Sequence, residues 1–128
     1  MKLRRLMGVT SLLVVVATVG AAAEDNGAAQ RGKVKYQHTC SPCHGSGPGD
    51  DGRPQLPGTT ALQLKYKGTM PAVLEARTDL TAIVLRGFVR GGSWSMPPFR
   101  KTELSDAEID DIAAYLATSS KSGATTAR

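Results

Sequence analysis

The stretch Cys40-Ser41-Pro42-Cys43-His44 is the most specific chemical pattern in this sequence of 128 residues. If it continues as a helical turn, Cys40 and Cys43 share one face because they stand three residues apart. Their sulfurs can then join the two vinyl groups of one porphyrin, and the imidazole of His44 points at the iron from the same side. C-x-x-C-H is the signature of covalent haem attachment. The sequence therefore predicts one haem c, held by Cys40 and Cys43, with His44 as an axial ligand.

Three other kinds of site could use the same residues. A zinc site would need His38 beside the two cysteines and His44, and four donors within seven residues do not easily surround one tetrahedral ion. A thioredoxin-like thiol pair would need a βαβ framework, which the pattern lacks. A disulfide between Cys40 and Cys43 would leave His44 unexplained. The haem interpretation is the one we favour.

The second axial ligand has to come from another part of the chain. Met96 lies in Ser95-Met96-Pro97-Pro98-Phe99, where two prolines stiffen the loop and can hold the sulfur against the iron. Met70 is the rival thioether, although it stands directly before an expected helix. His38 is too near the attachment turn to reach the far face of a haem. We predict Met96.

The start of the chain reads as a secretory signal. Positive residues precede an apolar run centred on Leu12-Leu13-Val14-Val15-Val16, and Ala21-Ala22-Ala23 supplies a cleavage pattern. Residues 1–23 are therefore predicted to be a signal peptide that directs the protein to the periplasm, with an uncleaved membrane anchor as the alternative. No later segment is long and apolar enough to span a bilayer, so no membrane association is expected after cleavage.

Charge counts exclude one class of partner. The full chain has a net charge of +5, and removal of residues 1–23 leaves 13 lysines and arginines against 11 acids, a net charge of +2. No run of cations with interleaved aromatics remains, so a nucleic-acid partner is not expected. Residues 24–102 hold 11 of these cations and 6 of the acids. A basic surface on this part, with Lys65 and Lys67 among the candidates, is expected to steer an acidic partner.

Periodicity in the mature chain favours helices over strands, and the predicted fold class is all-α. Helices are expected at residues 28–39, 60–67, 71–77, 82–90 and from 105 to about 117, with a Gly- and Pro-rich loop at 45–59 and a flexible tail at 118–128. Thr81 is expected to cap the fourth of these helices, and Ser105 with Glu108 to form a capping box at the last. The cytochrome-like domain that these elements would form is placed at 24–117.

Taken together, the attachment motif, the Met-Pro loop and the two flanking helices resemble the class I cytochromes c over nearly all of residues 28–117. The resemblance implies a small fold of four or five helices around one covalently bound haem. It also implies that Gly32 and Tyr36 cross the last helix at Ile112 and Tyr115. A glycine within a helix costs about 1 kcal/mol relative to alanine, and close helix approach is the physical reason to tolerate Gly32.

Other residues are placed near the haem by the same resemblance. Pro54-x-Leu56-x-Gly58 is similar to the loop whose proline carbonyl accepts a hydrogen bond from the ligating histidine. Such a bond would set the ring orientation and tautomer of His44. Trp94 and Arg53 are candidates to contact the haem propionates.

A narrower resemblance links segments 57–68, 77–81 and 99–103 to the cytochrome subunit of 4-cresol dehydrogenase and of related eugenol-type hydroxylases. It implies a flavoprotein partner that oxidises a para-alkylphenol and passes electrons from FAD to haem. The external acceptor would be a small copper protein or another cytochrome. The alternatives are a free, diffusible electron carrier and a haem sensor or peroxidase with an exchangeable sixth ligand. The chain shows no other enzyme site of its own, such as paired carboxylates or a nucleophile with its base.

Overall fold

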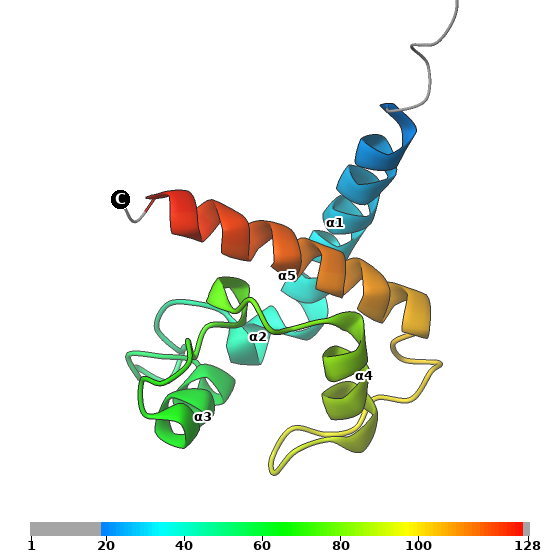
Figure 1. Ribbon diagram of the computed structural model, residues 1–128. Helices are drawn as coiled ribbons and strands as arrows, with labels where there is room; N and C mark the ends of the chain where they lie inside the picture. Colours follow the sequence, from blue (N-terminus) through cyan, green and yellow to red (C-terminus); the bar gives the residue numbers. More distant parts are fainter. Residues whose placement is uncertain (1–18, 127–128) are drawn as a thin grey trace, which may run out of the picture.

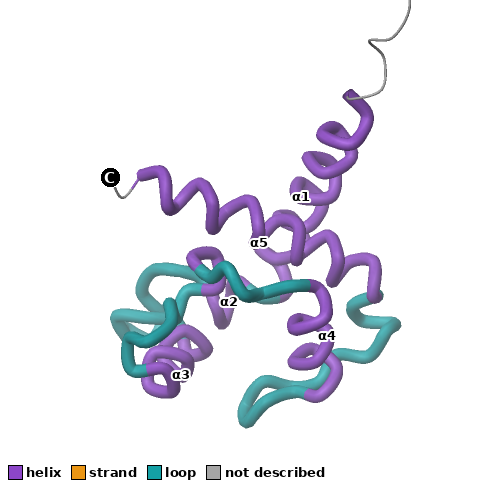
Figure 2. The backbone as a smooth tube through the Cα atoms, in the orientation of Figure 1, coloured by secondary structure: helices purple, strands orange, loops and turns teal. Residues whose placement is uncertain are grey.

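The computed structural model describes residues 19–126, and within them the regular structure is helical (Figures 1 and 2). The elements are α1 (Val19–Thr39), α2 (Ser41–His44), α3 (Pro57–Tyr66), the 3₁₀ turn η1 (Leu74–Ala76), α4 (Ala82–Gly91) and α5 (Asp106–Thr126). Within this range the β-type pairing is limited to one isolated bridge, between Ser93 and Met96. The prediction of an all-α fold with four or five helices is confirmed.

The two long helices, α1 and α5, cross at a point where their backbones almost touch (Figure 1). Gly32 is buried there, and a Cβ atom on it would lie 1.8 Å from the carbonyl oxygen of Asp111 and 2.8 Å from the amide nitrogen of Ile112. A side chain of any size would push the helices apart. The predicted crossing of Gly32 with Ile112 is therefore present, and close approach is the reason for the glycine.

Below the crossing, aromatic and aliphatic side chains form the main core. The rings of Tyr36 and Tyr115 pack with their centroids 5.3 Å apart and their planes tilted by 48°. The core residues around them lie within α4 and α5 or shortly before these two helices: Leu80, Leu85, Val89, Leu104, Ile109, Ile112, Ala113 and Leu116. The helix crossing thus supplies the rigid base from which the shorter elements extend.

Both predicted helix starts are observed. The amide of Val84 donates to the hydroxyl of Thr81, which caps α4. At α5, Glu108 accepts a hydrogen bond from the amide of Ser105 at 2.7 Å, and the amide of Glu108 donates to the Ser105 hydroxyl at 3.2 Å. These reciprocal bonds form the expected capping box and satisfy donors that a helix start leaves free.

Three helix predictions were wrong in their bounds. α1 begins at Val19, nine residues before the expected start at residue 28. α3 begins at Pro57, three residues earlier than expected, because proline at a first helical position lacks only an amide that would be unpaired anyway. The helix expected at 71–77 is reduced to the short turn η1. The guanidinium of Arg77, at the end of that turn, lies over the ring of Tyr66 and bonds both oxygens of Asp79, which favours the local turn over a longer helix.

The end of the domain also differs from expectation. Residues 118–126, predicted to be a flexible tail, continue α5 to Thr126. The prediction rested on small polar composition, but these hydroxyls bond carbonyls of the preceding turn: Thr118 to Ala114, Ser119 to Leu116 and Ser120 to Ala117. Their bonding is therefore compatible with a helix.

At the other end, residues 1–18 of the predicted signal lie outside the described residues, and the division at residue 23 stays a prediction. In the part from 19 to 126, no helix combines the length and apolarity needed to cross a membrane.

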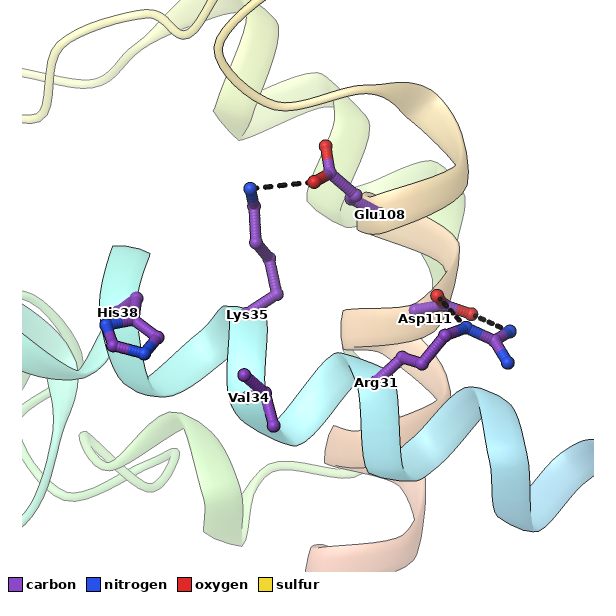
Figure 3. A pocket seen from close by; sticks show the side chains of 6 residues that line it. All are labelled: Arg31, Val34, Lys35, His38, Glu108 and Asp111. Atoms are coloured by element: carbon purple, nitrogen blue, oxygen red, sulfur yellow. Dashed lines mark hydrogen bonds and ion pairs between the residues drawn. The ribbon is translucent and has the colours of Figure 1, made fainter.

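Ion pairs distribute the charge more evenly than the sequence suggested. Acids of α5 pair with cations of α1 and α4. Arg31 bonds both oxygens of Asp111 at 2.8 Å and Lys35 approaches Glu108 to 2.7 Å (Figure 3). On the α4 side, Arg86 pairs with Asp110 and Arg90 with Asp106. Much of the expected excess of cations in residues 24–102 is therefore neutralised within the domain.

Two of these acids make the stability of the fold depend on pH. Hydrogen bonds from Lys101 and Arg90 lower the pKa of Asp106 to about 2, and bonds from Lys35 and Ser105 lower that of Glu108 to about 2. Both values lie below the ordinary ones, so this contribution is complete above pH 4.5 and is lost as the pH falls toward 2. We expect the free energy of unfolding, measured with urea, to decrease over that interval. The double variant Asp106→Asn with Glu108→Gln should show a shallower decrease, and an unchanged slope would contradict this assignment.

Candidate haem site

The attachment motif forms one tight helical turn between α1 and the following loop. The carbonyl of Cys40 accepts hydrogen bonds from the amides of Cys43, at 3.1 Å, and His44, at 2.8 Å. The turn predicted from the sequence is therefore present, and three-residue spacing brings both sulfurs to the same face. Cys40 is half-buried against the core, Cys43 is exposed, and both are free thiols.

Burial sets the chemical state of the motif. It raises the pKa of the Cys40 thiol to about 11, with a further contribution from Cys43, so this thiol is protonated at neutral pH. Burial also lowers the pKa of His44 below its ordinary value. The imidazole is then neutral at physiological pH, which is the form that binds a metal. Its Nδ1 atom is buried and has no hydrogen-bond partner.

The start of α3 packs directly on His44. A Cβ atom on Gly58 would lie 2.7 Å from Cε1 of the imidazole, 2.8 Å from its Nδ1 and 2.7 Å from the carbonyl oxygen of Cys43. The next residue, Thr59, is 1% exposed, and its hydroxyl donates to the carbonyl of Gly45 at 2.9 Å. Gly58 thus leaves room for the ring, while Thr59 ties α3 to the end of α2. The sequence indicated Gly58 only as part of the Pro54-x-Leu56-x-Gly58 motif, and no role was predicted for Thr59. The position of Thr59 directly after this glycine is the feature that could have indicated one.

The loop with Pro54 does not make the contact that the resemblance implied. The expected hydrogen bond from His44 to the Pro54 carbonyl is not formed, since Nδ1 of His44 has no partner. The carbonyls on either side of Pro54 face other donors: Arg53 accepts from the amide of Gly49, and Gln55 from the hydroxyl of Thr60. The ring edge that carries Nδ1 is instead closed by the backbone of Gly58.

Met96 ends a two-residue hairpin after α4. Ser93 and Met96 exchange two backbone hydrogen bonds, of 3.0 and 2.9 Å, and Gly92 before them has a φ of 68°. A Cβ atom on Gly92 would lie 2.9 Å from the Met96 carbonyl, so glycine is required in this close turn. The amide of Phe99 donates to Val89 at 2.8 Å and returns the loop to α4. Met96 is half-buried against the core, held by a loop that is constrained at both ends.

The remaining candidate side chains, which are Trp94, Arg53 and His38, are all exposed. Trp94, at the tip of the hairpin, is fully exposed at 104% with a φ of 54°, and Arg53 is an exposed partner of Asp51. His38 lies on α1 beside Val34, in an open groove of about 500 Å³ that the α1–α5 ion pairs border (Figure 3). Within the described residues, no three His, Cys, Asp or Glu side chains converge on a point that could hold a metal ion. The geometry therefore gives no support to a zinc site.

These features fit a haem bound through the attachment motif. Two thiols on one face of a helical turn match two vinyl groups, and the half-buried imidazole of His44 directly follows the second thiol. Residues 27–116 match the model of the family described as cytochrome C oxidase, cbb3-type, subunit III. The chain belongs to this family of c-type cytochromes. Comparison with curated proteins and with solved structures found no match for this cytochrome.

Membership settles the coarse identity of the domain. This cytochrome is a class I c-type cytochrome, which implies haem c and electron transfer, as the sequence predicted. The narrower resemblance to the cytochrome subunit of 4-cresol dehydrogenase finds no support in the comparisons.

Gly58 provides a sharp test of the site of this cytochrome. We expect Gly58→Ala to displace either the His44 ring or the Cys43 carbonyl, since the new Cβ atom would lie under 3 Å from both. The yield of haem-loaded protein and the midpoint of thermal unfolding should both fall. Gly91→Ala is the matched control, because a Cβ atom there meets nothing within 4 Å. Equal yields and midpoints for the two variants would contradict the contact.

Proposed function

We propose that this cytochrome c is an exported carrier of single electrons with one covalently bound haem. Cys40 and Cys43 provide the two thioether links, and His44 and Met96 are the axial ligands. The observation that carries the proposal is the single helical turn that brings the Cys40 and Cys43 thiols to one face and places the half-buried imidazole of His44 directly after them.

The residues of the chain would have separate tasks. When bound, the haem iron supplies a couple that gains and loses one electron. Gly58 leaves the space that the imidazole of His44 occupies, and the constrained hairpin holds Met96 against the core. If His44 and Met96 both bound the iron, they would leave no position open to oxygen or substrate, and a Met/His pair would raise the reduction potential. This arrangement favours electron transfer over a sensor or peroxidase role.

The finer part of the proposal concerns the partner. The resemblance of segments 57–68, 77–81 and 99–103 supports a flavoprotein dehydrogenase that oxidises para-alkylphenols with FAD and delivers electrons to this haem in the periplasm. A copper protein or a second cytochrome would then accept them. The alternative is a diffusible carrier without a permanent partner. A cytochrome that never co-purifies with a co-expressed flavoprotein of this class would favour the alternative.

Covalent attachment is the first point to test. We expect the protein, expressed with its first 23 residues in a host that matures c-type cytochromes, to keep its haem on a denaturing gel and to be recovered from the periplasm. The double variant Cys40→Ala with Cys43→Ala should lose the covalent haem completely. Ser46→Ala, an exposed change two residues after His44, is the control and should retain it. Covalent haem in the double cysteine variant would overturn the proposal.

A further inference from the structure

The main chain at the end of the attachment motif is held by two buried hydroxyl groups from different helices. The hydroxyl of Tyr36, on α1, donates to the carbonyl of His44 at 3.3 Å. The hydroxyl of Thr59, on α3, donates to the next carbonyl, that of Gly45, at 2.9 Å. Both side chains are 1% exposed. Two consecutive carbonyl groups are therefore held by hydroxyls from two different helices, at the residue whose ring would bind iron.

Packing alone does not explain the hydroxyl of Tyr36. Its ring packs on that of Tyr115, and a phenylalanine would fill the same space. Burying a hydroxyl costs free energy unless it finds a partner, so the group is retained at this site with an acceptor that compensates. The partner ring offers a contrast, since the hydroxyl of Tyr115 points to the carboxylate of Glu75 and not to the motif.

The same reasoning applies to Thr59. It is the most deeply buried residue of α3, and its hydroxyl reaches back 14 residues in sequence to the end of α2. Because Gly58 already packs against the imidazole, the Thr59 bond determines how closely this glycine approaches the ring. A valine has nearly the same shape and would remove only the bond.

We propose that Tyr36 and Thr59 are positioning residues that clamp the backbone around His44 and thereby set the orientation of its imidazole. The inference rests on the proposed function, in which this ring is an axial ligand. With both carbonyls anchored, the imidazole can turn only about its own side-chain bonds, and Gly58 limits that rotation. The clamp supplies the restraint that the unformed Pro54 bond does not.

Removing either hydroxyl should change the surroundings of the iron without creating a cavity in the core. In Tyr36→Phe and in Thr59→Val we expect a shift of the g values in the electron paramagnetic resonance spectrum of the oxidised protein and a lower reduction potential. The potential should fall because each lost hydroxyl dipole had its positive end toward the motif. Tyr115→Phe is the matched control, since it removes a hydroxyl from the same aromatic pair that does not bond the motif. Its g values and potential should equal those of the wild type.

Each result bears on the clamp. Shifts in both test variants and none in the control support it, whereas wild-type g values in Tyr36→Phe and Thr59→Val overturn it, whatever the effect on thermal stability. In the intact wild-type protein, the hydroxyl protons of Tyr36 and Thr59 should exchange with solvent roughly tenfold or more slowly than that of an exposed threonine. Rapid exchange would also overturn the clamp. Failure of the proposed function is separately visible, because the wild type would then carry no covalent haem while hydroxyl exchange could still be measured.

Discussion

Replacing Gly32 with alanine should lower the free energy of unfolding by at least about 3 kcal/mol, near the upper end of the usual overpacking penalty. A Cβ atom at this position would lie 1.8 Å from the Asp111 carbonyl oxygen, which belongs to rigid helical backbone and cannot turn aside. Relief requires the whole of α1 to move away from α5. That movement would also disturb the Tyr36–Tyr115 ring pair and the ion pair between Arg31 and Asp111.

The comparison that isolates this effect is Gly87→Ala. Gly87 lies within α4, and a Cβ atom there meets nothing within 4 Å. Because alanine is the better helix former, this variant should gain about 0.5 to 1 kcal/mol. Urea unfolding should show that the free energy of unfolding falls in Gly32→Ala and rises in Gly87→Ala. A Gly32→Ala protein as stable as the wild type would show that the helices can separate without cost, and the proposed role of the crossing would be wrong.

Replacing Met96 with alanine should abolish the sulfur-to-iron charge-transfer absorption of the oxidised protein and lower its reduction potential. The hairpin held by Ser93 and Gly92 would remain, so the change removes the thioether and leaves the loop in place. The reduced protein should then bind carbon monoxide readily, because the sixth position of the iron would be open. A methionine that merely filled the core would lower stability without any of these spectral changes.

The rival ligand is the natural control. Met70→Ala removes the other thioether of residues 24–128, and we expect it to leave the charge-transfer absorption and the potential unchanged. Met70 is half-buried beyond the end of α3, and it is not among the side chains that pack on the core, as Met96 is. If Met70→Ala abolishes the absorption and Met96→Ala preserves it, the two assignments are reversed.

Many of the charged side chains are paired between helices. Acids on α5 form ion pairs with Arg31, Lys35, Arg86 and Arg90. The uneven distribution of charge along the sequence is therefore partly balanced by ion pairs between helices. Lys65 takes a different environment, with its ammonium 5.3 Å from the ring centre of Tyr66 and 5.8 Å from that of Phe88. A linear count of charges could not reveal this pairing, because each partner lies on a different helix.

Local features were predicted well where one turn of chain is enough to create them. The caps at Thr81 and Ser105 need only neighbouring residues, and the attachment turn needs only the spacing of Cys40 and Cys43. The tail prediction failed because local hydroxyl–carbonyl bonds accompany a helix that continues through a segment of small polar composition. The Pro54 prediction failed because tertiary packing decides which group the ring of His44 meets, and that group is Gly58.

The sequence by itself determined the local features of this protein: two cysteines and a histidine in one helical turn, and a methionine in a proline-stiffened loop. Side-chain identity and short spacing are sufficient for these, because the interactions involved are local. Only the tertiary structure decided what surrounds the ligand. The hydroxyls of Tyr36 and Thr59 reach His44 and Gly45 from different helices, and their alignment depends on how closely α1, α2 and α3 pack. Such distances arise from close packing between elements that are distant in the sequence. The hydrophobic periodicity of a sequence does not reveal them.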